Sequence, residues 1–423
     1  MAQGNPGPYG KLFGRVPASS ADQEHTTVEV RASLGASYDD ALLAPEGSPA
    51  DTPSQSGVSG DGSIFAGLDH RASVFVVNLS GGGGRGQYFT EPSAYGTNQY
   101  FAHALVGAQL TTRFEARATA QYTHSPAYQF FYGFGRVPVP QDNDSAFKPE
   151  NAELPPNAYA AQMLENDTLY GTASLITRIT EKSSLDLSVT HNETRFAKQP
   201  DDDVTLRGYR ATWQWQFQRG LGVHASYGQD HVDLQSPERL DYDSTLMDVG
   251  VDFNRAFSVA RRTTLGFNTS TALVKHDGSE GEFRINGGVS LAKFFRRTWH
   301  ASVQLNRATS FIPGFTEPLY SDTFAASLGG MFSRRIDFSV MASASRGESV
   351  FSDASGFATY TATSQLSFAL GKHISAYGSY FTYWYEVPAD TFTLTVPGTM
   401  ARQVVSAGLR FYLPVYTNER RGQ

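Results

Sequence analysis

The 423-residue chain contains no cysteine. This absence excludes a disulfide scaffold, a thiolate metal site and a cysteine nucleophile, and it suits an oxidising compartment of the cell envelope. Positive charge is not in excess either, because the formal net charge is −7 and the pI is about 5.8. A nucleic-acid partner therefore has no electrostatic support, and none is expected.

Long apolar runs are also missing. The mean hydropathy is −0.34, and the sequence predicts no membrane-spanning helix, which would need about 20 consecutive apolar residues. A barrel strand needs only about 9–11 residues, of which alternate ones face lipid, so this composition does not exclude a membrane barrel. The stretch from Met1 to Pro8 has no basic and no apolar segment. We expect the sequence to represent a mature, exported form without its signal peptide.

Apolar and polar residues instead alternate over most of the chain, from about residue 26 to residue 413. In the clearest stretch, Tyr209, Trp213 and Trp215 belong to the apolar phase, and charged, hydroxyl or amide residues separate them. A period of two gives a β-strand one apolar and one polar face. The same alternation occurs at 28–38, 114–123, 185–190, 248–253, 283–291, 299–306, 365–370 and 405–413.

Two kinds of connection separate these stretches. Eight are short and mostly basic, near 70–71, 113, 181–182, 219–220, 255–262, 296–297, 334–335 and 372–373. Nine are long, acidic and rich in Gly, Pro, Ser and Asn, at roughly 40–62, 81–98, 133–167, 195–204, 229–244, 275–281, 311–321, 347–356 and 386–400. This count requires 18 strands, and an even number puts both termini on the side of the short turns.

We therefore predict an all-β fold, a single closed transmembrane antiparallel β-barrel of about 18 strands with up-and-down topology. Its first and last strands should pair, because hydrocarbon tolerates no open sheet edge. Residues 1–25 are expected to form a periplasmic or lumenal segment, 26–413 the barrel and 414–423 a periplasmic tail. The expected location is a bacterial outer membrane, with both termini periplasmic and the long loops extracellular.

A β-propeller and a soluble β-sandwich fit less well. No motif recurs at the spacing of propeller blades. The apolar face is rich in Ala and Gly among its aromatics, which suits fluid lipid better than a packed core. Eleven aromatic residues, among them Tyr38, Tyr209 and Phe411, lie near the ends of the predicted strands, as in the aromatic girdles of membrane barrels. The alternative is that aromatic residues are simply common in β-sheets.

The closing stretch carries a resemblance to a known group. Phe381 to Pro388, Gln403 to Pro414, the strand count and the basic turns together resemble the outer-membrane β-barrel porin type 2 group, and the likeness extends over essentially the whole chain. It implies a large 18-stranded barrel, often encoded beside genes for exopolysaccharide assembly. Many outer-membrane barrels end on an aromatic residue, whereas this chain continues past Tyr412 to Gln423.

Charged residues of both signs fall in the polar phase and are predicted to line the lumen. They either set the selectivity for solutes and ions or pair across strands and stiffen the wall, and both readings stay open. Because the signs nearly cancel, weak ion selectivity is expected. The predicted lining residues are Glu29, Arg31, Glu115, Arg117, Asp186, Arg210, Asp248, Asp252, Arg284 and Arg410.

Two loop segments are candidate functional elements. The loop at 133–167 is the longest and contains five prolines, and a short helix is expected at Ala158–Leu164 with Asn157 as its N-cap. The loop either constricts the lumen or forms an external flap, and the N-terminal 25 residues could also enter the pore. The acidic triplet Asp201–Asp203 could bind Ca²⁺ or bridge lipopolysaccharide through divalent ions. A solvated acidic turn is the more common case, so no metal or cofactor is expected.

Catalysis is not expected. His224 shares a face with Ser226, and His300 shares one with Ser302, but i,i+2 neighbours on a strand lie about 7 Å apart, too far for a nucleophile and its base. The sequence also contains no nucleophile elbow and no helical zinc motif.

Two functions remain open from the sequence. The first is a porin or channel for small hydrophilic solutes, with carbohydrates as one candidate cargo. The alternative is a barrel component of a polysaccharide-export or other envelope complex, acting as conduit or scaffold. The expected partners are outer-membrane lipid and lipopolysaccharide, the barrel-assembly machinery, and either a second copy of the chain or an envelope-complex component.

Overall fold

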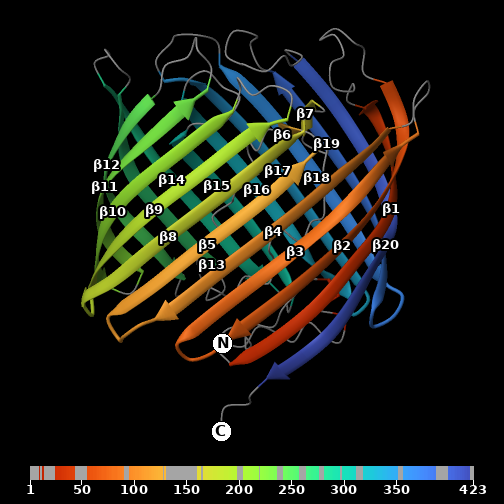
Figure 1. Ribbon diagram of the computed structural model, residues 1–423, viewed down its shortest axis with the longest axis horizontal. Coiled ribbons are helices and arrows are strands. Elements are labelled where there is room, and N and C mark those ends of the chain that lie inside the picture. Colours follow the sequence, from red (N-terminus) through yellow and green to blue (C-terminus); the bar gives the residue numbers. More distant parts are fainter. Residues whose placement is uncertain are drawn as a thin grey trace.

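The computed structural model is a closed barrel of 18 antiparallel strands (Figure 1). It describes residues 9, 12–13, 24–42, 55–89, 95–126, 128–129, 160–162, 165–197, 203–218, 220–235, 242–256, 263–275, 281–295, 298–310, 318–350, 356–386 and 399–419. The barrel strands are β1 (His25–Leu42), β2 (Gln55–Arg71), β3 (Phe75–Tyr88), β4 (Tyr95–Gln109), β5 (Phe114–Ser125), β8 (Asn166–Thr180), β9 (Ser183–Phe196), β10 (Val204–Gln218), β11 (Leu221–Leu234), β12 (Tyr242–Ala256), β13 (Thr263–Val274), β14 (Glu282–Phe295), β15 (Trp299–Ser310), β16 (Leu319–Ser333), β17 (Ile336–Ser349), β18 (Phe357–Ala369), β19 (Ile374–Glu386) and β20 (Thr399–Glu419). A separate two-stranded sheet pairs β6 (Tyr128–Gln129) with β7 (Ala160–Gln162).

The strand order is up-and-down, as predicted. Each barrel strand pairs with its neighbours in the sequence, and β5 pairs with β8 across the segment that holds β6 and β7. The barrel closes where β1 pairs with β20, from His25 opposite Glu419 to Asp39 opposite Val404. Closure pairs the backbone groups of β1 with those of β20. This pairing is needed in a membrane because hydrocarbon offers no hydrogen-bond partner.

The outer surface of the barrel is apolar around its whole circumference. Exposed side chains such as Leu34, Tyr209, Val249, Leu305 and Tyr360 come from strands far apart around the barrel. A soluble protein rarely exposes so large an apolar surface, whereas the hydrocarbon of a bilayer matches it. The barrel is therefore built to span a membrane with its strands. In the described part of the chain, no helix is long and apolar enough to cross one.

The strand ends that the predicted short turns connect lie at one end of the barrel, the lower rim in Figure 1. β1 begins and β20 ends at this rim, because His25 lies opposite Glu419. Tyr9 lies there as well, since its ring is 5.8 Å from the guanidinium carbon of Arg335 in the turn between β16 and β17. The strand ends that flank the long connections lie at the opposite rim, and most residues of these connections are outside the described part of the chain.

The glycine run after residue 80 lies inside a strand, so our prediction of a loop over 81–98 was too wide. β3 and β4 both extend well into this range. Gly82 lies opposite Phe65 on β2 and Phe101 on β4, and these two rings stack at 6.0 Å across it. A Cβ atom on Gly82 would lie 3.0 Å from the Phe101 ring. The glycine thus makes room for flanking aromatics, a known way to retain glycine in a sheet.

The last strand continues six residues beyond the end that we predicted at residue 413. Pro414 lies opposite Glu29, and the next pair joins Tyr416 to Val28, so Val415 is an extra residue that forms a bulge. Proline cannot donate a ladder hydrogen bond, and bulges are among the few places where a strand tolerates it. Pairing then resumes as far as Glu419, which the sequence pattern did not indicate.

The helix that we expected at Ala158–Leu164 is not formed. Residues Ala160 to Gln162 form β7, in which Gln162 pairs with Tyr128 and Ala160 with Gln129. A helix of seven residues is unstable on its own because nucleation costs more than so few hydrogen bonds return. Pairing with β6 supplies backbone partners instead.

Candidate functional site: the inward face of the barrel

The inward face carries the polar phase of the alternation. On β10, Tyr209, Trp213 and Trp215 are exposed on the outside, so Arg210 and Gln214 between them face the lumen. The ten charged residues that we predicted as lining residues all lie on described strands, in the phase opposite to the exposed apolar side chains. Their role in selecting solutes stays a prediction.

Several of these charges are paired locally rather than across the lumen. Arg31 lies 2.6 Å from Glu29, and Arg117 lies 2.6 Å from Glu115, each pair within one strand. Asp186 on β9 and Glu115 on β5 lie on either side of Ile176 on β8, because both residues pair with Ile176 in the strand register. At the Glu29–Arg31 and Glu115–Arg117 positions the wall therefore presents nearly neutral pairs to the lumen.

Around the closing seam, arginines lie against aromatic rings. The guanidinium of Arg31 is 5.6 Å from the Phe65 ring centre and 5.8 Å from that of Tyr412. Arg410 is two residues before Tyr412 on β20. Its guanidinium carbon lies 4.3 Å from the Tyr377 ring centre, and it donates a 3.1 Å hydrogen bond to the Gln365 side chain. The structure thus brings Glu29 and Arg31 together, whereas Arg410 contacts residues of β18 and β19.

The remaining predicted lining residues lie on other parts of the wall. Arg284 lies 3.8 Å from Glu282 and donates a 3.1 Å hydrogen bond to the backbone oxygen of Val350. Arg210 on β10 is two residues after Gly208, and Gly208 pairs with Asp230 on β11. Neither residue belongs to the cluster at the seam.

A histidine between two carboxylates forms the most defined polar cluster on the inward face. His224 on β11 contacts Asp252 through Nδ1 at 2.7 Å and Asp248 through Nε2 at 3.2 Å, and the His224 side chain is only 10% exposed. Gly250 lies between the two aspartates, and a Cβ atom there would lie 2.5 Å from the His224 ring. We predicted Asp248 and Asp252 as lining residues, but we did not predict their contact with His224.

His224 and Ser302, one residue from each of the two serine–histidine pairs considered from the sequence, have other hydrogen-bond partners. His224 bonds to carboxylates, and Ser302 bonds to Ser327 on the next strand at 2.7 Å. Ser–Ser contacts of this kind recur on the inward face, for example between Ser37 and Ser59 at 2.7 Å. They are cross-strand pairs that stabilise the wall.

The inward face has a wetted side and a covered side. On β5 and β10, the lumen-facing Arg117, Gln121, Arg210, Gln214 and Gln216 are exposed. Many lumen-facing side chains from β17 to β20 and at the end of β1 are buried, among them Asp39, Ser345, Thr361, Tyr383 and Arg402. Water-exposed polar groups therefore line mainly the β5–β10 side of the barrel.

The loop candidates lie mostly outside the described residues. This applies to the loop core between 130 and 159, to Asp201 and Asp202, and to nearly all of the N-terminal segment. Asp203 is described, and its carboxylate accepts a 2.7 Å hydrogen bond from the Phe196 backbone, across the base of the loop. Within the described ranges, no group of three or more His, Asp or Glu is arranged to hold a metal ion.

Comparisons with known proteins find likeness only at the level of overall chain course. No protein-family model matches the chain, and no curated protein is significantly similar to it. Similar solved structures include Pseudomonas aeruginosa OpdL, with 10% identity and a TM-score of 0.44 over 92% of this chain and 99% of that one. Pseudomonas aeruginosa OccK11 (OpdR) has 12% identity and a TM-score of 0.45 over 92% and 96%. Acinetobacter baumannii OccAB4 has 11% identity and a TM-score of 0.41 over 93% and 99%. Likenesses this distant carry no argument about function.

Proposed function

We propose that this protein is a bacterial outer-membrane channel that lets small hydrophilic solutes pass through the lumen of its barrel. The observation that carries the proposal is the division of one closed sheet into an apolar outside and a polar, partly exposed inside. Barrels of 16–18 strands are wide enough for an aqueous path. An outer membrane is the usual location of barrels that cross with strands and short turns.

Unsatisfied polar atoms on the wall support an aqueous interior. Within the described residues, Asp186 Oδ1, Asn192 Oδ1 and Arg284 Nε are buried and have no hydrogen-bond partner in the protein. Buried polar groups nearly always have a partner, and ordered water is a common one. A hydrated lumen would supply these bonds.

The charges on the wetted side bear on the class of solute. Arg117 is paired with Glu115, so this pair adds little net charge, and the exposed Arg210 adds one positive charge on this side. Exposed amides, Gln121, Gln214 and Gln216, lie on the same side. This lining favours neutral hydrophilic solutes, of which carbohydrates are one class, over strong selection of cations or anions.

Single-channel recording of the purified protein in planar bilayers tests the proposal. Stable conductance steps are expected, with a cut-off diameter measurable by exclusion of neutral polymers. A second protein lacking residues 136–160 tests whether the longest loop constricts the lumen, because removal of a constriction would raise both conductance and cut-off. Unchanged conductance would show that this loop is an external flap.

Steady absence of conductance would overturn the channel proposal. It would favour the second role, in which the barrel is a conduit or scaffold of a polysaccharide-export or other envelope complex and opens only with a partner. Burial of many lumen-facing side chains from β17 to β20 is the observation that favours this role, because buried groups leave fewer polar side chains for a solute to contact on that side. Lipopolysaccharide and the barrel-assembly machinery are proposed partners in either case.

A further inference from the structure

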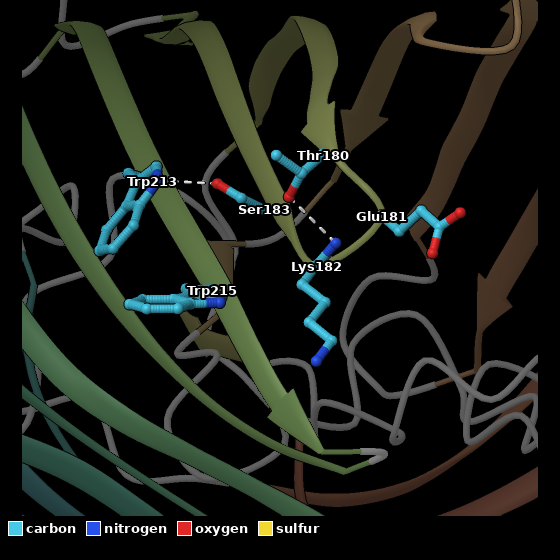
Figure 2. A pocket seen from close by; sticks show the side chains of 6 residues that line it. All are labelled: Thr180, Glu181, Lys182, Ser183, Trp213 and Trp215. Carbon is cyan, nitrogen blue, oxygen red and sulfur yellow. Dashed lines mark hydrogen bonds between the residues drawn. The ribbon is translucent and has the colours of Figure 1, made fainter.

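An open depression of about 510 Å³ lies on the barrel wall at the turn between β8 and β9. Its lining residues come from that turn and from the neighbouring β10: Thr180, Glu181, Lys182, Ser183, Trp213 and Trp215 (Figure 2). The two indoles belong to the outward phase of β10, with 37% and 43% of their surfaces exposed. The depression therefore opens toward the membrane, at the rim that carries the short turns.

The indoles are held in place by their strand neighbours. Trp213 lies opposite Leu185, Trp215 lies opposite Ser183 on one side and Val223 on the other, and the small Ser183 leaves room beside both rings. The Trp213 indole nitrogen donates a 2.9 Å hydrogen bond to the Ser183 hydroxyl. The Trp213 ring therefore has a fixed orientation on the outer surface.

Lys182 forms the polar edge of the depression, and hydrogen bonds stabilise the turn that carries it. The backbone nitrogen of Lys182 donates to the Thr180 hydroxyl at 3.2 Å, and its backbone oxygen accepts a 2.7 Å bond from Gln216 on β10. Among the described residues, no carboxylate forms an ion pair with the Lys182 ammonium. Figure 2 shows that the Glu181 side chain extends from the turn away from the two indoles, so it does not occupy this position.

We propose that this depression binds a membrane phospholipid, with the headgroup phosphate at the Lys182 ammonium and the acyl chains along the apolar surface above the indoles. Indole rings prefer the level of the lipid headgroups, and a lysine there extends its apolar stem along the wall and its charge to the phosphates. Further along the same outward face of β8 and β9, Leu175, Leu187 and Val189 are exposed and continuous with the depression.

The charge at the site indicates which phospholipid binds best. One lysine near a lipid surface favours an anionic over a zwitterionic lipid by about fivefold. We therefore expect a preference for phosphatidylglycerol over phosphatidylcholine. This inference rests on the proposed function only in requiring that the barrel span a membrane.

Tryptophan fluorescence gives a direct test, because the chain has only four tryptophans, at positions 213, 215, 299 and 384. The double variant Trp299→Phe, Trp384→Phe leaves only the two indoles of the site. It is placed in phosphatidylcholine vesicles that contain a minor fraction of either dibrominated phosphatidylglycerol or dibrominated phosphatidylcholine. Quenching by the glycerol lipid is expected to exceed that by the choline lipid at equal mole fraction, with an apparent preference of about fivefold.

Charge variants in the same background identify the residue responsible. Lys182→Gln should bring the ratio of the two quenching constants to about one, and Lys182→Arg should retain the preference. The matched control is Lys372→Gln, which removes an equivalent exposed lysine from the turn between β18 and β19 and should leave the ratio unchanged. A variant that keeps only Trp384, on β19, should show no preference.

Three outcomes overturn the inference. Equal quenching by both brominated lipids, or an equal effect of Lys372→Gln and Lys182→Gln, would show that no specific site exists. Either result would leave the channel proposal intact if the same protein conducts in planar bilayers. Absence of quenching by both lipids would show that this wall does not face lipid, and would overturn the membrane barrel together with the site.

Discussion

Arg402 on β20 and Asp39 on β1 form a buried ion pair across the seam where the barrel closes. The Arg402 Nε atom lies 2.9 Å and 3.1 Å from the two carboxylate oxygens, and a second contact joins Nη2 to Oδ2. The two side chains are 1% and 4% exposed. Beside them, Asp40 accepts a 2.6 Å hydrogen bond from the Gln403 backbone, so consecutive aspartates hold the end of β1 to β20.

We predict that Arg402→Ala lowers the free energy of unfolding by about 3–5 kcal/mol, because it leaves the Asp39 carboxylate buried without its partner. Urea titration of the reconstituted barrel, followed by tryptophan fluorescence, measures the change. The double variant Asp39→Leu, Arg402→Met should recover much of the loss, since it removes both charges and keeps apolar volume.

The matched control for this prediction is an exposed Arg–Asp pair between neighbouring strands. Arg307 and Asp322 form two hydrogen bonds of 2.5 Å, but their side chains are 52% and 58% exposed. Arg307→Ala should cost only about 0–1 kcal/mol, because the pair is more than half exposed and lies close to the strand ends Ser310 and Leu319, at the rim of the barrel. Equal losses for Arg307→Ala and Arg402→Ala would contradict a special role for the seam.

The overall architecture was predictable because the signals for it are local. Alternation with period two, short basic turns and long polar loops each lie within a few residues, and together they gave the barrel, its strand count and its closure. The ion pair at the seam was not predictable, because Asp39 and Arg402 are 363 residues apart and only the register of β1 on β20 brings them together.

The same limit applies to the candidate site. The alternation of polar and apolar residues predicted that Asp248 and Asp252 face the lumen. Their contact with His224 depends on the register between β11 and β12, which the sequence pattern does not contain. We assigned Gly82 to a loop because a run of glycines shows no alternation of polar and apolar side chains. Its partners Phe65 and Phe101 lie on other strands.

We predict that Gly250→Ala destabilises the barrel by about 1–3 kcal/mol. A Cβ atom at this position would run into the Thr269 backbone oxygen and the His224 ring, so the His224 cluster would have to move. The control is Gly378→Ala on β19, where an added Cβ atom would meet nothing within 4 Å. Urea titration of both variants compares them directly, and equal midpoints would show that the space beside His224 is not restricted.

We predict that the double variant Arg117→Glu, Arg210→Glu makes the channel cation-selective, because it replaces two exposed positive charges on the wetted side by negative ones. The reversal potential in a potassium chloride gradient measures this, and we expect the ratio of cation to anion permeability to rise by about twofold or more. Arg195→Glu is the control: this exposed residue lies on the outward phase of β9 with Leu187 and Val189, so the same kind of charge reversal there should leave selectivity unchanged. If the two proteins showed the same reversal potential, the β5–β10 side would not line the conducting path, and the ions would have to pass along another part of the wall.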